Sequence, residues 1–216
     1  MKSIGNIYLT WCKGKGERRI PIGVIKRNKT LGTRFHYLEE GLNDAKKFGF
    51  SIYEGFPDIS KTYSKNVIEI FGQRIMRSER NDVKDFYDFW LIDKNYIDDV
   101  YYMLAHTQGI LPTDNYEFLA EFNSTKNLKF ITEISGLSKN KISSDVLKKG
   151  DIITYRKEPN NSYDRYAVKV FKDNLCLGYI KIIHNRIFYR SNRDFKVTVQ
   201  HIEKNGVLNR VFLRVE

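Results

Sequence analysis

Residues 147–180 read LKKGDIITYRKEPNNSYDRYAVKVFKDNLCLGYI, and this stretch decides the fold of the second half of the chain. It contains three runs of alternating or β-branched residues, at 151–156, 166–171 and 175–180. A polar turn, Glu158 to Asp164, separates the first two runs. Pro159 fixes the backbone there, and the Asn and Asp side chains can hydrogen-bond to it. The stretch therefore predicts three strands with a long polar loop after the first.

One residue of the polar loop does not fit a purely structural role. A loop held by its own side chains explains the Asn and Asp residues, but it does not explain the aromatic Tyr163. A ring in so polar a turn either folds back onto the strands or points outward, where it can stack on a flat ligand.

The regions on both sides extend the β pattern. Further strand-like runs lie at 130–135, 195–202 and 210–215, so that six strands in under 90 residues predict a small β-barrel or sandwich. Residues 181–193 (KIIHNRIFYRSNR) interrupt them and suit a short basic amphipathic helix or turn. Turn-forming residues between 109 and 129 predict the domain linkage, which divides the chain into residues 1–125 and 126–216.

The first domain is expected to combine strands and helices. Short runs at 7–11, 20–26 and 33–37, separated by Gly- and Lys-rich turns, predict a small antiparallel meander. From Leu38 the apolar spacing becomes helical, with expected helices around 42–48, 67–75, 83–90 and 100–105. The predicted fold class is α+β, with a meander plus helices followed by a small barrel carrying one or two short helices.

The charges are distributed unevenly. The chain carries a net charge of +11, and residues 126–216 hold 19 basic against 9 acidic residues. Residues 1–37 hold 9 basic and 1 acidic, whereas residues 38–125 hold 9 basic and 16 acidic. A lopsided field steers polyanions toward the basic parts, although a basic surface can also serve only solubility. No apolar run is long enough to span a bilayer and no signal peptide is evident, so we expect a cytoplasmic protein.

The sequence lacks the usual catalytic and metal-binding patterns. It has no phosphate-binding Gly-x-x-x-x-Gly-Lys loop, no Gly-x-Ser-x-Gly elbow and no His-Glu-x-x-His helix. The two cysteines and four histidines stand apart from one another, without metal-ligand spacing; they are Cys12, Cys176, His36, His106, His184 and His201. We therefore expect no enzyme activity, no metal and no cofactor.

The second half resembles the HIRAN domain. The resemblance rests on ISG (134–136), LKKGD (147–151), EPNNSYDRYAVKV (158–170) and LGYI (177–180), in the order of the family. It implies a β-barrel module that in helicases binds single-stranded DNA at a 3′ end. Tyr163 would then stack on the terminal base and Asp164 would accept a hydrogen bond from the 3′ hydroxyl. Tyr179, which falls on a further site position of the family, would also stack, and Lys181 would contact a phosphate.

Three arginines beyond this motif, Arg186, Arg190 and Arg193, are expected to contact phosphates as well. The chain also departs from the family, because helicase-linked members carry a basic–aromatic pair where this sequence has Leu137-Ser138-Lys139-Asn140. The absence of that pair weakens the case for recognition of an end but leaves electrostatic binding of nucleic acid intact.

The first half resembles the N-terminal subdomain of HipA-type kinase toxins in bacteria. The similar residues include IGVI (22–25), FHY (35–37), FGQR (71–74) and LAHTQG (104–109). This resemblance implies a protein-facing surface in residues 38–125, with no kinase lobe after it.

The sequence thus predicts a non-catalytic accessory protein that binds single-stranded DNA or a DNA 3′ end. The alternative is a protein-interaction subunit of a kinase-toxin or antiphage system. A metal-dependent hydrolase that uses Asp164 with Glu158 is a third possibility. DNA or RNA, the preferred end and the oligomeric state stay open.

Overall fold

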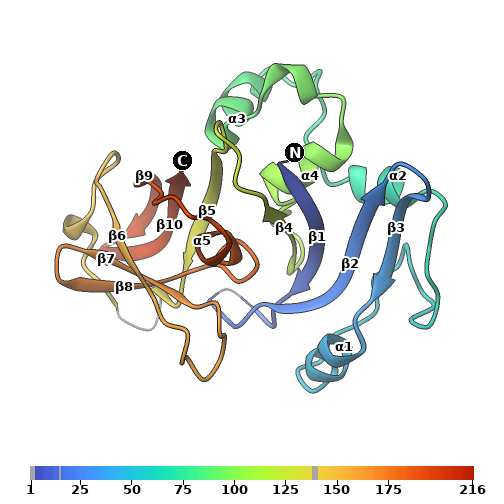
Figure 1. The fold of residues 1–216 in the computed structure, drawn as a ribbon, viewed down its shortest axis with the longest axis horizontal. Coiled ribbons are helices and arrows are strands. Elements are labelled where there is room, and N and C mark those ends of the chain that lie inside the picture. Colours follow the sequence, from blue (N-terminus) through green and yellow to red (C-terminus); the bar gives the residue numbers. More distant parts are fainter. Residues whose placement is uncertain (1–2, 15, 138–140) are drawn as a thin grey trace. The chain divides into compact units, whose positions relative to one another are not determined.

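The computed structural model describes residues 3–14, 16–137 and 141–216 (Figure 1). Its fold is mixed α+β, with many strands and few helices, as the sequence predicts. The chain divides into two compact units, Lys2–Glu121 and Phe122–Glu216. None of the helices in the described ranges combines the length and apolarity needed to cross a bilayer.

The first unit is built on a four-stranded sheet in the order β3-β2-β1-β4. Its first three strands pair antiparallel as a meander. The fourth strand, β4, was not predicted, because turn-forming residues on both sides made this segment look like a linker. Phe118, Leu119 and Ala120 in it are completely buried, so the segment belongs to the core. The strand bounds are β1 Ile4–Trp11, β2 Ile20–Asn28, β3 Gly32–Tyr37 and β4 Tyr116–Phe122.

Helices of the first unit cover an aromatic core. The ring of Phe71 lies 4.8 Å from that of Phe56 and 4.9 Å from that of Phe118, between ring centroids. Phe48, at the end of the helix expected around 42–48, is exposed because that helix ends two residues earlier. The helices are α1 Glu39–Lys46, α2 Val67–Gly72, α3 Val83–Trp90, the 3₁₀ turn η1 Lys94–Tyr96 and α4 Val100–Thr107.

The second unit contains a six-stranded sheet in the order β6-β7-β8-β5-β10-β9, whose neighbours all run antiparallel. One short helix, α5 (Arg186–Arg190), lies within the predicted basic segment. The strands are β5 Phe130–Ser135, β6 Thr154–Lys157, β7 Val168–Lys172, β8 Leu175–Ile180, β9 Val197–Asn205 and β10 Val207–Val215, with the 3₁₀ turn η3 at Ser144–Val146.

The sheet of the second unit does not close into a complete barrel. Strands β6 and β9 are its two ends in the strand order. An isolated bridge pairs Ile152 with Thr198, and the backbone N–H of Ile153 donates to the carbonyl of Val197 at 2.9 Å. These contacts join the segment before β6 to β9 without forming a ladder. The predicted small β-barrel is therefore not confirmed.

Candidate nucleic-acid interface

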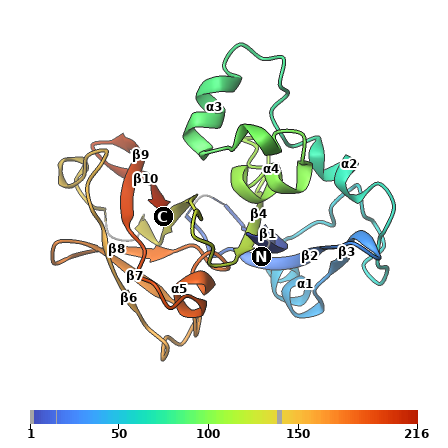
Figure 2. The same ribbon diagram turned by 45° about the horizontal axis from the view of Figure 1, so that its top comes forward.

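The polar loop between β6 and β7 is held by hydrogen bonds of its own. At its base, the N–H of Glu158 donates to the carbonyl of Ala167 at 2.8 Å. At its tip, the side-chain oxygen of Asn161 accepts the backbone N–H groups of Tyr163 and Asp164, at 3.0 and 3.3 Å. Figures 1 and 2 both show this loop projecting beyond the strands that it connects. A single asparagine thus fixes the backbone that carries the two expected end-binding residues.

Tyr163 points outward. Its relative exposure is 83%, and its ring has no aromatic or cation–π contact with any residue in the described part of the chain. Of the two orientations that the sequence allowed, the structure shows the exposed one. A free ring on a fixed backbone can stack on a base with little loss of backbone entropy.

Asp164 is held against the segment that begins α5. Its Oδ2 accepts a hydrogen bond from the Asn185 side-chain amide at 2.6 Å, and its Oδ1 accepts the backbone N–H of Tyr166 at 2.9 Å. The carboxylate is only partly buried. Because each carboxylate oxygen can accept more than one hydrogen bond, Asp164 can still accept a ligand hydroxyl.

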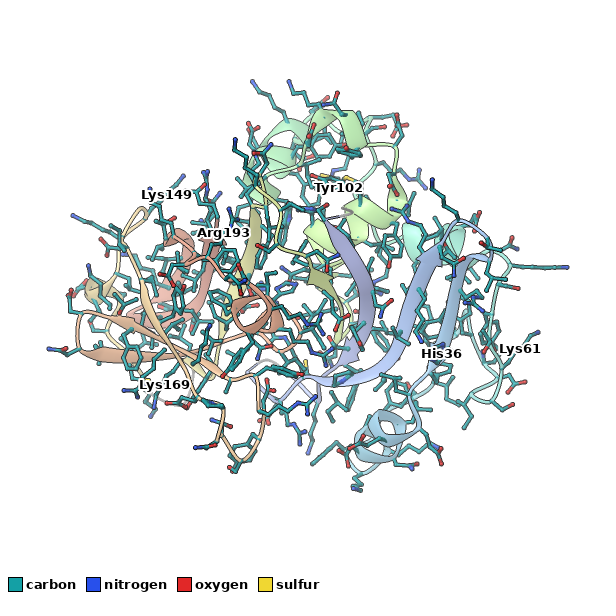
Figure 3. All side chains as sticks on the ribbon, viewed as in Figure 1. His36, Lys61, Tyr102, Lys149, Lys169 and Arg193 are labelled. Atoms are coloured by element: carbon teal, nitrogen blue, oxygen red, sulfur yellow. The ribbon has the colours of Figure 1, made fainter. Side chains whose placement is uncertain are left out.

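Tyr179 supports the base of the loop. Its hydroxyl donates to Glu158 Oε2 at 3.1 Å, and Lys169 Nζ, labelled in Figure 3, lies 3.5 Å from Glu158 Oε1. Burial alone would raise the pKa of Glu158, but hydrogen bonds from Tyr179 and Asn161 and the charge of Lys169 hold it below its ordinary value. Partial burial and the same Glu158 contact raise the pKa of Tyr179. The Tyr179 hydroxyl therefore positions the loop through Glu158.

This contact gives a pH-dependent prediction. We expect Tyr179→Phe to lower the free energy of unfolding by about 1 kcal/mol or less at neutral pH, because one partly exposed hydrogen bond is lost. A carboxyl whose folded pKa is depressed stabilises the fold above its unfolded pKa and loses that contribution as the pH falls through the folded value. Urea unfolding at neutral pH should show the difference in free energy between wild type and variant. Unfolding at a pH below both the folded and the unfolded pKa of Glu158 should not. An equal difference at both pH values would contradict the role of Glu158.

The phosphate-contact role expected for Lys181 is wrong for this structure. The side chain is completely buried, and its Nζ lies 2.9 Å from Glu133 Oε2. Glu133 also binds Arg210, whose Nε lies 2.9 Å from Oε1. Lys181 follows β8 directly and points into the unit, where a carboxylate from β5 compensates its charge. The sequence around Lys181 gives no sign of Glu133, which lies 48 residues earlier.

The three predicted arginines are not in one place. The guanidinium carbon of Arg186 lies 5.7 Å from the ring centroid of Tyr166, so Arg186 is next to the loop. Arg190 is exposed at the end of α5. Arg193, labelled in Figure 3, instead donates to the carbonyl of Lys126 at 3.2 Å and lies over the Phe195 ring at 5.0 Å. Arg193 thus contacts residues outside the loop.

Sequence reasoning missed a second aromatic and basic group beside the loop. The rings of Tyr166 and Tyr189 meet edge to face at 5.6 Å. Arg165 lies 4.8 Å from the Tyr166 ring centroid, and Lys157 lies 5.5 Å from that of Tyr189. We call these four residues the Tyr166–Tyr189 surface. Its sequence signal is an aromatic residue next to Arg in both DRY (164–166) and FYR (188–190), but only the fold brings the two together.

The structure does not describe the segment in which the sequence departs from the HIRAN pattern. Ser138, Lys139 and Asn140, where the family carries its basic–aromatic pair, lie outside the described residues, while Leu137 before them is buried. Within the described ranges, no group of three His, Cys, Asp or Glu side chains is arranged to hold a metal ion.

Comparisons with known proteins find a similarity within the second unit. Residues 127–210 match the family model of the HIRAN domain. Among solved structures, the chain is similar to the HIRAN domain of human HLTF, with 18% identity, a TM-score of 0.32, and coverage of 40% of this chain and 74% of that one. No curated protein matches. The likeness of residues 1–125 to kinase toxins and a bacterial origin stay predictions. The chain is thus similar to the HIRAN domain over residues 127–210.

Proposed function

We propose that this HIRAN domain binds single-stranded nucleic acid, with a preference for a DNA 3′ end, in an accessory and non-catalytic role. The observation that supports this most strongly is the exposed ring of Tyr163 on a loop fixed by Asn161. Tyr163 stacks on the terminal base, and the neighbouring Asp164 accepts a hydrogen bond from the terminal hydroxyl. A phosphate at that position would be repelled by the carboxylate.

The basic residues beside the loop supply the second part of the binding energy. Arg186 and the Tyr166–Tyr189 surface offer cations next to aromatic rings, the combination that single-strand binding proteins use. Arg190 extends this surface along α5. These residues replace Lys181 in the phosphate-binding role.

The test compares single strands that end in a 3′ hydroxyl or a 3′ phosphate, by fluorescence anisotropy. We expect tighter binding of the hydroxyl end, and a roughly tenfold to thousandfold loss of affinity between 50 and 200 mM salt for a handful of phosphate contacts. Asp164→Asn should remove most of the discrimination because the repelling charge is gone. Equal binding of both ends by the wild-type protein would leave only a cationic surface, and no binding at low salt would disprove the proposal.

A further inference from the structure

The first unit, outside the HIRAN-like residues, carries two neighbouring cations that have no counterion among the residues that the structure describes. Lys26 on β2 is directly opposite Arg34 on β3, and two pairs further toward the first helix Val24 is opposite His36. Side chains alternate between the two faces of a strand, so Lys26, Arg34 and His36 share one face. Phe35 and Tyr37, on the opposite face, belong to the aromatic core.

Like charges directly opposite each other on paired strands destabilise a hairpin, since their Cβ atoms lie about 4.5–5.5 Å apart. No carboxylate among the described residues lies within ion-pair distance of Lys26 or Arg34. The Arg34 Nε is buried and has no hydrogen-bond partner in the described part of the chain. An unsatisfied buried donor is costly, so this arrangement is unfavourable for the isolated unit.

Three other arginines of the same unit form ion pairs with carboxylates. Arg19 pairs with Glu117 at 2.7 Å, Arg27 with Asp99 at 2.6 Å, and Arg74 with Asp114 at 2.6 Å. Carboxylates are thus available to these strands and helices, and the fold places them elsewhere. Lys26 and Arg34 therefore differ from these three arginines in having a like charge, not a carboxylate, as their cross-strand neighbour.

The electrostatics of His36 agree with this geometry. Burial, Lys26 and Arg34, in that order, lower the pKa of His36 from its ordinary value. A positive field that disfavours a further cation is one that favours an anion. Figure 3 labels His36 on β3.

We propose that Lys26, Arg34 and His36 form a second binding site for the phosphodiester backbone of a nucleic acid, on the first unit of the chain. The guanidinium of Arg34 matches the geometry of phosphate oxygens, and Lys26 adds a mobile point charge beside it. A strand phosphate relieves the repulsion of the cross-strand pair. We favour nucleic acid over an acidic protein because an arginine fork, an imidazole and an ammonium on one face, within three consecutive residue pairs, suit one compact anionic group.

The experiment uses the full chain and a single strand phosphorylated at both ends, so that contact with a free 3′ hydroxyl does not contribute. The salt slope is the slope of log affinity against log salt concentration. We expect Lys26→Gln and Arg34→Gln each to reduce its magnitude by about 0.7 and the affinity by about fivefold at ~0.1 M salt. Lys84→Gln, an exposed change of equal charge on α3, is the control and should bind as the wild type does. Tyr163→Ala should keep its binding of this blocked strand, which separates the site from the HIRAN loop.

A second measurement does not depend on nucleic acid. In low salt, Lys26→Gln should raise the thermal unfolding midpoint, because the like-charge pair is removed, and inorganic phosphate should stabilise the wild type more than this variant. Unchanged salt slopes, or an equal loss in Lys84→Gln, would overturn the proposal. Stronger protection by polyglutamate than by the blocked strand would also overturn it and would assign the face to an acidic protein.

Discussion

Replacing Tyr163 with alanine is expected to weaken binding of a single strand with a free 3′ hydroxyl by roughly 5- to 150-fold. Stacking of a base on an aromatic ring contributes about 1–3 kcal/mol, and about 1.4 kcal/mol corresponds to a factor of ten. The folded state should be unaffected, because the ring is 83% exposed and contacts no other ring in the described ranges. Fluorescence anisotropy gives the affinity, and thermal unfolding checks the fold.

Matched variants make this result specific. Tyr163→Trp keeps a flat ring and should bind at least as tightly as the wild type. Tyr96→Ala removes a tyrosine that is 50% exposed in the first unit and should leave the affinity for the single strand unchanged. A Tyr163→Ala protein that binds as well as the wild type would mean that the ring does not stack, and that the affinity comes from the cations alone.

The loop could be predicted from the sequence because its information is local. Pro159, Asn161 and Asp164 act on neighbouring backbone groups, and the structure shows Asn161 and Asp164 bonded within the loop. The sequence leaves the orientation of Tyr163 open, since a ring in a polar turn can also fold back onto the strands. Its neighbours in space could not be predicted, because the contact of Asp164 with Asn185 spans 21 residues.

The features that the sequence did not predict depend on contacts between residues far apart in the chain. The strand β4 lies between turn-forming residues, and only pairing with the distant β1 shows that it is a strand of the core. The burial of Lys181 depends on Glu133, and the Tyr166–Tyr189 surface depends on α5 packing beside the loop. In each case long-range packing overrides the local pattern.

The burial of Lys181 leads to a prediction of a large loss of folding stability. We expect Glu133→Gln to lower the free energy of unfolding by about 3–5 kcal/mol, because the carboxylate shared by a fully buried lysine and Arg210 is lost. Lys181→Met should lower the free energy of unfolding by much less, since the methionine fills a similar volume and Glu133 keeps its contact with Arg210. Urea unfolding of the two variants measures the difference.

The double variant Glu133→Gln/Lys181→Met separates charge from packing. If the buried lysine causes the damage in Glu133→Gln, removing it should recover part of the lost stability, which a double-mutant cycle reports as a coupling energy. Folded Lys181→Met should also bind a single strand with the wild-type salt slope, because a buried ammonium cannot release a counterion from a phosphate. A salt slope reduced by about 0.7 in Lys181→Met would instead support the phosphate contact expected from the sequence. The buried lysine would then have to reach the surface when nucleic acid binds.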